Sequence, residues 1–246
     1  DAYGPRDAAF HKANLKGKDL VRWKFQRYAK NYLRSVKGVD ESLGRLQGVL
    51  KELELDDDTV VIYCSDQGFY IGDHGWYDKR WMYDESLKMP FVVKWPGVTK
   101  PGSRDKHLIQ NLDYAETFLE MAGSPIPADM QGASLVPLLK GESPKNWRKS
   151  IYYHYYEYPS VHMVPRHYGI RTARHKLMHF YQFDNEWELY DLKKDPDELQ
   201  NIYGDSEKAK ITGRLKKQLV ALQKHYEDDS DVSVKPDLIK RFRPGG

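Results

Sequence analysis

Residues 59–68 read TVVIYCSDQG, an apolar and β-branched run that ends in a polar turn. The run does not alternate between apolar and polar residues, which is typical of a strand covered on both faces. Before it, apolar residues recur every three or four positions from residue 20 to residue 53 and predict a long amphipathic helix, which could break near Gly38. Helix and buried strand together indicate an α/β fold and place Cys64 in its core.

The sequence changes in texture near residue 146 of its 246 residues. Before this point come a second apolar run at 91–95 and a short capped helix that begins at Asp113. After it, short aromatic runs between turn residues predict a small antiparallel sheet, and an apolar stripe after Ser206 predicts a final helix. We therefore expect two domains, residues 1–145 and residues 146–246.

The composition argues against several kinds of partner. The net charge is +3 with 30% charged residues, and no long block of one sign indicates a nucleic-acid groove or an anionic membrane surface. No apolar stretch approaches the roughly 20 residues that a membrane helix needs. The single cysteine excludes an internal disulfide and a cysteine-based zinc site. We expect neither a nucleic-acid nor a membrane partner.

Charged side chains crowd the segment that follows the strand. Residues 64–86 hold five carboxylates, one histidine and two cations, and ligands of α/β sheets bind beyond the carboxyl ends of strands. Asp66 and Gln67 stand at that point, and their oxygens suit Ca²⁺ or Mg²⁺. A metal ion together with Lys79 could hold a tetrahedral oxyanion. Alternatively, Asp66 caps the next element and residues 78–80 form a solvated turn.

Four segments, in order, resemble the C-terminal half of a type I sulfatase of the alkaline-phosphatase superfamily. They are VVIYCSDQGFYIGDHGWYDKRWMYDESLKMPFVVKWPG (60–97), LDYAETFLEMAGSPIPADMQGASLVPLLKG (112–141), YGIRTARHKLMHF (168–180) and ELYDLKKDPDELQNIY (188–203). The resemblance implies the C-terminal part of an alkaline-phosphatase-like sheet-and-helix domain over residues 1–145, followed by a small antiparallel α+β subdomain. It also implies that Asp66 and Gln67 bind a divalent cation, usually calcium, and that Lys79 binds the sulfate group.

Two stretches, HGWYDKRWMYDES (74–86) and YYEYPSVHMVPRHYGIRTARHKLMHFY (155–181), look most like the N-acetylglucosamine-6-sulfatase-like branch, which acts on glycans. If Lys79 points at sulfate, Asp78 and Arg80 flank the pocket mouth and can grip sugar hydroxyls. His167 could reach a sugar hydroxyl or make a structural hydrogen bond, and His74 could face the sulfate pocket or orient a neighbouring loop. We expect a sulfated carbohydrate as substrate. The family also implies an extracytoplasmic location, whether periplasmic, secreted or lysosomal.

The chain departs from the family pattern at the nucleophile. Type I sulfatases convert a Cys or Ser within a C/S-x-P/A-x-R motif to formylglycine. Cys64 is followed by SDQG, which lacks both the Pro or Ala and the Arg, and no serine of the chain fits the motif. We expect the formylglycine in an upstream segment and the N-terminal half of the sulfatase domain as a partner. We also expect this chain, as a C-terminal fragment, to be inactive by itself.

Three hypotheses about function follow. The favoured one is a sulfuric ester hydrolase that acts on sulfated glycans, with an N-acetylglucosamine-6-sulfate-like substrate. A phosphodiesterase or phosphonate hydrolase of the same superfamily is the second, although residues 66–80 offer few ligands for the second metal ion that such enzymes typically add. The third is a binding module without turnover.

Overall fold

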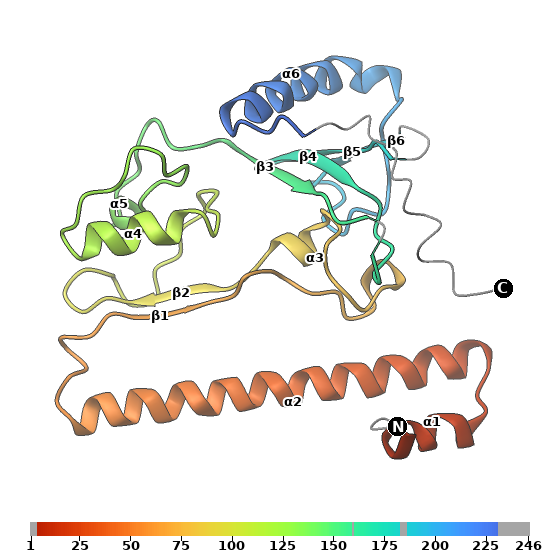
Figure 1. Ribbon diagram of the computed structural model, residues 1–246, viewed down its shortest axis with the longest axis horizontal. Helices are drawn as coiled ribbons and strands as arrows, with labels where there is room; N and C mark the ends of the chain where they lie inside the picture. The colour runs from red at the N-terminus through yellow and green to blue at the C-terminus, as the bar shows by residue number, and fades with distance from the viewer. Residues whose placement is uncertain (1–3, 159, 183–185, 231–246) are drawn as a thin grey trace. The chain divides into compact units, whose positions relative to one another are not determined.

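The computed structural model describes residues 4–158, 160–182 and 186–230 (Figure 1). Its contacts divide the chain into two compact units, Asp1–Thr59 with Phe69–Asp78, and Val60–Gly68 with Lys79–Gly246. The sequence-based boundary near residue 145 stays a prediction. Within the described residues, no helix is long and apolar enough to cross a membrane.

The first unit is built on one long helix. Helix α1 (Gly4–Ala13) precedes α2 (Gly17–Glu52), which confirms the predicted amphipathic helix and runs through Gly38 without a break. No residue of α2 is buried. Tyr28 and Tyr32 of α2 stack on Phe69, with ring centroids 6.1 and 5.9 Å apart, so segment 69–78 is fastened to this helix by aromatic packing.

The second unit begins with a two-stranded antiparallel ribbon. Strand β1 (Val61–Cys64) pairs with β2 (Phe91–Lys94), and Val61 lies opposite Lys94 (Figure 1). The expectation that this strand is covered on both faces is wrong for the described residues, because residues 61–63 are half-buried and Cys64 is exposed. An uninterrupted apolar pattern shows that a strand can be buried on both faces, but burial also requires neighbouring elements. Within the described residues, β1 pairs with one strand.

Two short helices follow the ribbon. Helix α4 (Asp113–Met121) begins at the predicted residue and ends before Gly123, whose φ of +67° suits a C-terminal glycine. The carboxylate of Asp113 accepts two hydrogen bonds of 2.5 Å from Arg148, and Glu116 accepts one of 2.6 Å from the Gly132 N–H. The Glu116 bond holds the loop that leads to α5 (Val136–Leu139), and the Arg148 bonds hold the segment that follows α5.

The remaining elements form the antiparallel subdomain. Four strands, β3 (Ser150–Tyr155), β4 (His167–Thr172), β5 (His175–Phe180) and β6 (Glu186–Asp191), lie side by side in sequence order. After the short helix η2 (Ser206–Lys208), α6 (Ala209–His225) lies across the sheet (Figure 1). Leu215 and Leu219 of α6 are 1% exposed and pack on Ile170, Leu177 and Leu189. This confirms the expected α+β subdomain.

Strand β5 is buried along its whole length because two layers cover it. Helix α6 covers one face. Trp81 and Met82 lie against the sheet, and the Trp81 ring is 5.5 Å from that of Phe180. Gly169 allows this approach, since a Cβ there would lie 2.5 Å from the Met82 sulfur and 2.4 Å from the Leu177 carbonyl. The segment before α3 (Asp84–Leu87) is therefore packed on the sheet core.

Candidate active site

The polar turn after β1 carries the two predicted metal ligands. Asp66 is exposed and Gln67 is half-buried. The Ser65 hydroxyl lies 3.3 Å from Oδ1 of Asp66 and 3.0 Å from the Gln67 carbonyl. The Gly68 N–H donates to the Ser86 carbonyl at 2.7 Å, and a Cβ on Gly68 would lie 1.9 Å from the Glu85 carbonyl oxygen. The absence of a side chain at Gly68 lets the turn lie directly against α3, and Asp66 is exposed to solvent.

The donor set of this turn fits part of a calcium or magnesium shell. A carboxylate and an amide are hard oxygen donors, and Ca²⁺ takes six to eight such ligands. Within the described residues, no group of three or more His, Cys, Asp or Glu side chains could hold a metal ion. Asp66 and Gln67 can therefore supply two ligands of a shell that needs others.

One of the predicted sugar-binding residues, Arg80, contacts the same helix, and Lys79 directly precedes it in the sequence. Lys79 is half-buried. Arg80 has a φ of +89°, a value that residues with a Cβ rarely adopt. Its N–H donates to Oγ of Ser86 at 3.0 Å, its carbonyl accepts from the Tyr153 hydroxyl at 2.5 Å, and its Nε lies 3.9 Å from Oε2 of Glu157. Ser86 thus contacts both the Gly68 turn and the Arg80 peptide.

Two other predicted residues, His74 and Asp78, belong to the first unit. His74 lies in the short helix η1 (Asp73–Gly75), where its ring stacks on Trp76 at 5.9 Å and meets Tyr70 edge-on at 6.0 Å. The Asp78 carbonyl accepts from the Tyr70 N–H at 2.7 Å. Burial raises the pKa of Tyr28, and the Asp78 carboxylate raises it further. The ring contacts of His74 fit the loop-orienting alternative.

His167 is completely buried in an aromatic cage. Trp81 and Phe180 lie 5.8 and 5.0 Å from its ring. Burial lowers the pKa of His167 to about 4, so the ring is neutral near pH 7. The Pro165 carbonyl lies 2.8 Å from Nδ1 and must accept from it, which leaves Nε2 as the acceptor nitrogen. Among the described residues, the buried Nε2 has no hydrogen-bond partner.

The sequence reasoning missed a buried ionic cluster beside the site. Arg171 donates two hydrogen bonds, of 2.9 and 2.8 Å, to Asp84, and the fully buried Lys176 lies 2.8 Å from Asp84 and 2.7 Å from Glu198. Burial opposes ionisation of Asp84, but the Arg171 hydrogen bonds and the Lys176 charge hold its pKa well below the usual range. For Glu198, burial outweighs Lys176 and raises the pKa. A lysine inside the apolar stretch HKLMHF was the available signal.

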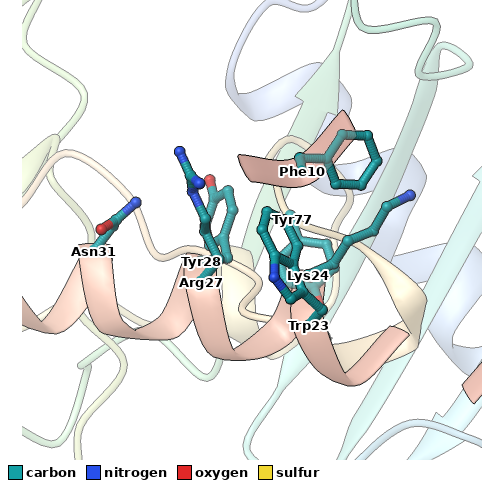
Figure 2. A pocket seen from close by; sticks show the side chains of 7 residues that line it. All are labelled: Phe10, Trp23, Lys24, Arg27, Tyr28, Asn31 and Tyr77. Atoms are coloured by element: carbon teal, nitrogen blue, oxygen red, sulfur yellow. The ribbon is translucent and has the colours of Figure 1, made fainter. Parts of the chain in front are cut away.

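A hollow on the first unit was also missed. It has a volume of about 460 Å³, and Figure 2 shows the aromatic and cationic side chains that surround it. The rings of Tyr28 and Tyr77 are 4.8 Å apart, and the Arg27 guanidinium lies 5.4 Å from the centre of the Trp23 ring. The lining residues are Phe10, Trp23, Lys24, Arg27, Tyr28, Asn31 and Tyr77.

Family models identify the chain. The model "N-sulphoglucosamine sulphohydrolase, C-terminal" matches residues 72–225, and the model "Sulfatase" matches residues 3–124. The chain belongs to the sulfatase family. It is a partial-length member of this family of sulfuric ester hydrolases. The match confirms the resemblance predicted from the sequence, and it also confirms the alkaline-phosphatase-like fold.

Individual relatives agree with this assignment. The chain is 49% identical over 244 residues to an N-acetylglucosamine-6-O-sulfatase of Bacteroides thetaiotaomicron, a match that covers 98% of this sulfatase chain and 44% of the relative. It is 30% identical over 212 residues to the multifunctional alkaline phosphatase superfamily protein PehA of Trinickia caryophylli, covering 81% of this chain and 41% of that protein.

A solved structure, described as a complex with its substrate D-glucosamine-2-N,6-O-disulfate, matches with a TM-score of 0.88 and 47% identity. The match covers 95% of this chain and 48% of the solved one. The sulfatase chain thus spans about half the length of the relatives that it matches.

Proposed function

We propose that this chain is the part of a glycan sulfatase that supplies two metal ligands, the sulfate-binding lysine and the substrate rim. The whole protein would hydrolyse the sulfate ester of an N-acetylglucosamine-6-sulfate-like sugar. The observation that carries the proposal is the 49% identity to an N-acetylglucosamine-6-O-sulfatase along 98% of the chain. Two contacts of Ser86 support it, because they attach the turn with Asp66 and the backbone of Arg80 to one short helix.

Asp66 and Gln67 would hold a divalent cation, Ca²⁺ by family expectation, with Mg²⁺ also compatible with oxygen donors. When bound, the cation would polarise a sulfate oxygen. Lys79 would place its ammonium group against the sulfate and stabilise the negative charge that develops during hydrolysis. The formylglycine nucleophile is expected in an upstream segment, since the chain has no C/S-x-P/A-x-R motif.

The four residues proposed to bind the sugar are Asp78, Arg80, His74 and His167. Asp78 can accept hydrogen bonds from sugar hydroxyls, and the Arg80 guanidinium can donate two in parallel. His167 offers the lone pair of Nε2 to a hydroxyl, whereas its complete burial within this chain supports the structural alternative. For His74, stacking on Trp76 supports a role in orienting its loop. The extracytoplasmic location stays a family expectation.

Three substrates test the proposal on the full-length protein that contains this chain. We expect turnover of N-acetylglucosamine-6-sulfate and of a chromogenic aryl sulfate, and little turnover of a phosphate diester. Preference for the diester would instead support the second hypothesis, a phosphodiesterase or phosphonate hydrolase of the same superfamily. The diester is included because the chain is 30% identical to a multifunctional member of that superfamily. The chain by itself should turn over none of them, because the nucleophile motif is missing.

Paired rim variants sharpen the test. Asp78→Ala and Arg80→Ala should reduce kcat/KM for the sulfated sugar far more than for the aryl sulfate, because the aryl sulfate offers no sugar hydroxyls. Equal losses of kcat/KM on the two substrates would show that Asp78 and Arg80 do not bind the sugar. Calcium content measured on the same samples shows whether the metal turn is intact.

A further inference from the structure

The backbone of Arg80 is held in an unfavourable conformation. At a φ of +89° a residue with a Cβ is strained, and it persists in this conformation only where neighbours enforce it. Two hydroxyls do so here. Oγ of Ser86 accepts from the Arg80 N–H at 3.0 Å, and the Tyr153 hydroxyl donates to the Arg80 carbonyl at 2.5 Å. Both hydrogen-bonding groups of the Arg80 backbone are thus bound by side chains of other elements.

Ser86 has a second contact that points in the opposite direction. Its main-chain carbonyl accepts from the Gly68 N–H at 2.7 Å, immediately after Asp66 and Gln67. The side chain of Ser86 therefore binds the backbone of Arg80, and the main-chain carbonyl of Ser86 binds the turn that carries the proposed metal ligands. A substitution that removes the hydroxyl leaves the backbone contact in place, so the two contacts can be separated by experiment.

Helix α3, which carries Ser86, has four residues and could not hold a position by itself. Its first residue fixes it. The Asp84 N–H donates to Glu198 at 2.7 Å, and the Asp84 carboxylate is bound by Arg171 and Lys176 of the sheet. Because Ser86 is 5% exposed and belongs to this anchored helix, its hydroxyl has a fixed place relative to the sheet.

We propose that Ser86 and Tyr153 are positioning residues for recognition of the sugar. Their hydroxyls hold the Arg80 peptide at its positive φ and so give the guanidinium one direction at the rim. This inference rests on the proposed function. Neither residue needs to touch the substrate, since each acts through the Arg80 backbone.

The test uses Ser86→Ala and Tyr153→Phe in the full-length protein, with N-acetylglucosamine-6-sulfate and an aryl sulfate as substrates. Each variant removes one hydroxyl. We expect kcat/KM for the sulfated sugar to fall about tenfold, mainly through KM, because one hydrogen bond of roughly this value is lost. Turnover of the aryl sulfate and the affinity for Ca²⁺ should stay close to wild type. Ser86→Thr, which restores a hydroxyl, should recover most of the loss.

Tyr83→Phe is the matched control, because the Tyr83 hydroxyl makes a similar bond of 2.7 Å to Glu188 on the same side of the sheet. It should leave the ratio of the two kcat/KM values unchanged. Equal losses on both substrates, no rescue by Ser86→Thr, or weaker Ca²⁺ binding in Ser86→Ala would overturn the positioning role. A wild-type protein that hydrolyses neither sulfate ester would instead overturn the proposed function, and the positioning role with it.

Discussion

Asp66 and Asp84 stand in one segment of the sequence and have opposite surroundings. Asp84 is 5% exposed and is bound by Arg171, Lys176 and Lys88. Asp66 is exposed, and its carboxylate lies 3.3 Å from the hydroxyl of the adjacent Ser65. A carboxylate whose partners are supplied by the protein stabilises the fold, whereas one left in solvent after a strand retains lone pairs for a metal ion. The comparison yields predictions in which burial decides the size of the effect.

The largest effect should follow from the loss of Lys176. Lys176→Met leaves Asp84 and Glu198 close together without the fully buried ammonium group that separates them. We expect the free energy of unfolding to fall by about 3–5 kcal/mol, the usual cost of breaking a buried ion pair. Urea unfolding at pH 7 measures the change.

Lys88→Met is the control for this prediction. Lys88 contacts the same carboxylate at 3.0 Å, but its side chain is 68% exposed. The loss should stay below about 1 kcal/mol, since exposed ion pairs contribute little. Similar losses for the two lysine variants would show that burial does not set the value of a contact with Asp84.

Lys79 should have the next largest effect, on turnover. Lys79→Ala in the full-length protein should lower kcat by about 10²-fold to 10³-fold, because one preorganised donor to the developing anion is lost. Calcium binding should be unchanged, since Lys79 supplies no metal ligand. Steady-state kinetics with an aryl sulfate and a calcium titration measure the two quantities. A kcat near wild type would remove Lys79 from the sulfate site.

His167 should make stability depend on pH. Its pKa is lowered to about 4 in the folded protein, against about 6.5 in an unfolded chain. The unfolded chain therefore binds the proton first as the pH falls. The contribution of His167 to the free energy of unfolding should therefore decrease between pH 6.5 and pH 4, by up to about 3 kcal/mol at the lower end.

Urea unfolding at pH 7 and pH 4.5 measures this slope. His167→Gln should flatten it. Asp84 does not contribute to the slope between pH 7 and pH 4.5. Its pKa is lowered in the folded protein, so the stability that it provides is lost at pH values below about 4, where an ordinary carboxylate takes up its proton. An unchanged slope in His167→Gln would contradict the assignment of the lowered pKa to this ring.

The sequence predicted what depends on local pattern. Periodicity located α2 and α6, and short aromatic runs between turn residues located the antiparallel sheet. The polar turn after an apolar strand led to the prediction that Asp66 and Gln67 bind a metal ion. Long-range pairing was beyond this reasoning. Lys176 meets Asp84 across 92 positions, and neither residue's neighbours in the sequence reveal the other.

The exposure of Cys64 was missed for a related reason. An unbroken apolar run shows that a strand can be buried, but the elements that lie against it decide whether it is. The link from Gly68 through Ser86 to Arg80 was equally hidden, because serine is common and its role here depends on one main-chain and one side-chain bond.

The smallest effect on the calcium-free protein is expected at Asp66. Because the side chain is exposed, Asp66→Ala should change the free energy of unfolding by about 0.5 kcal/mol or less without calcium. Added Ca²⁺ should stabilise the wild-type full-length protein by about 2.7 kcal/mol at 100 times its Kd. Asp66→Ala should lose most of this gain, and Gln67→Ala less of it, because an amide contributes a dipole and a carboxylate a full charge.

Thermal unfolding with and without Ca²⁺ separates the two aspartates. Asp84→Ala should destabilise the protein under both conditions, since it leaves Arg171 and Lys176 without their shared carboxylate. Asp66→Ala should matter when calcium is present. If Asp66→Ala destabilises the calcium-free protein as strongly as Asp84→Ala, Asp66 has a structural role. If Ca²⁺ stabilises Asp66→Ala as much as the wild type, Asp66 is not a ligand, and exposure after a strand does not identify one here.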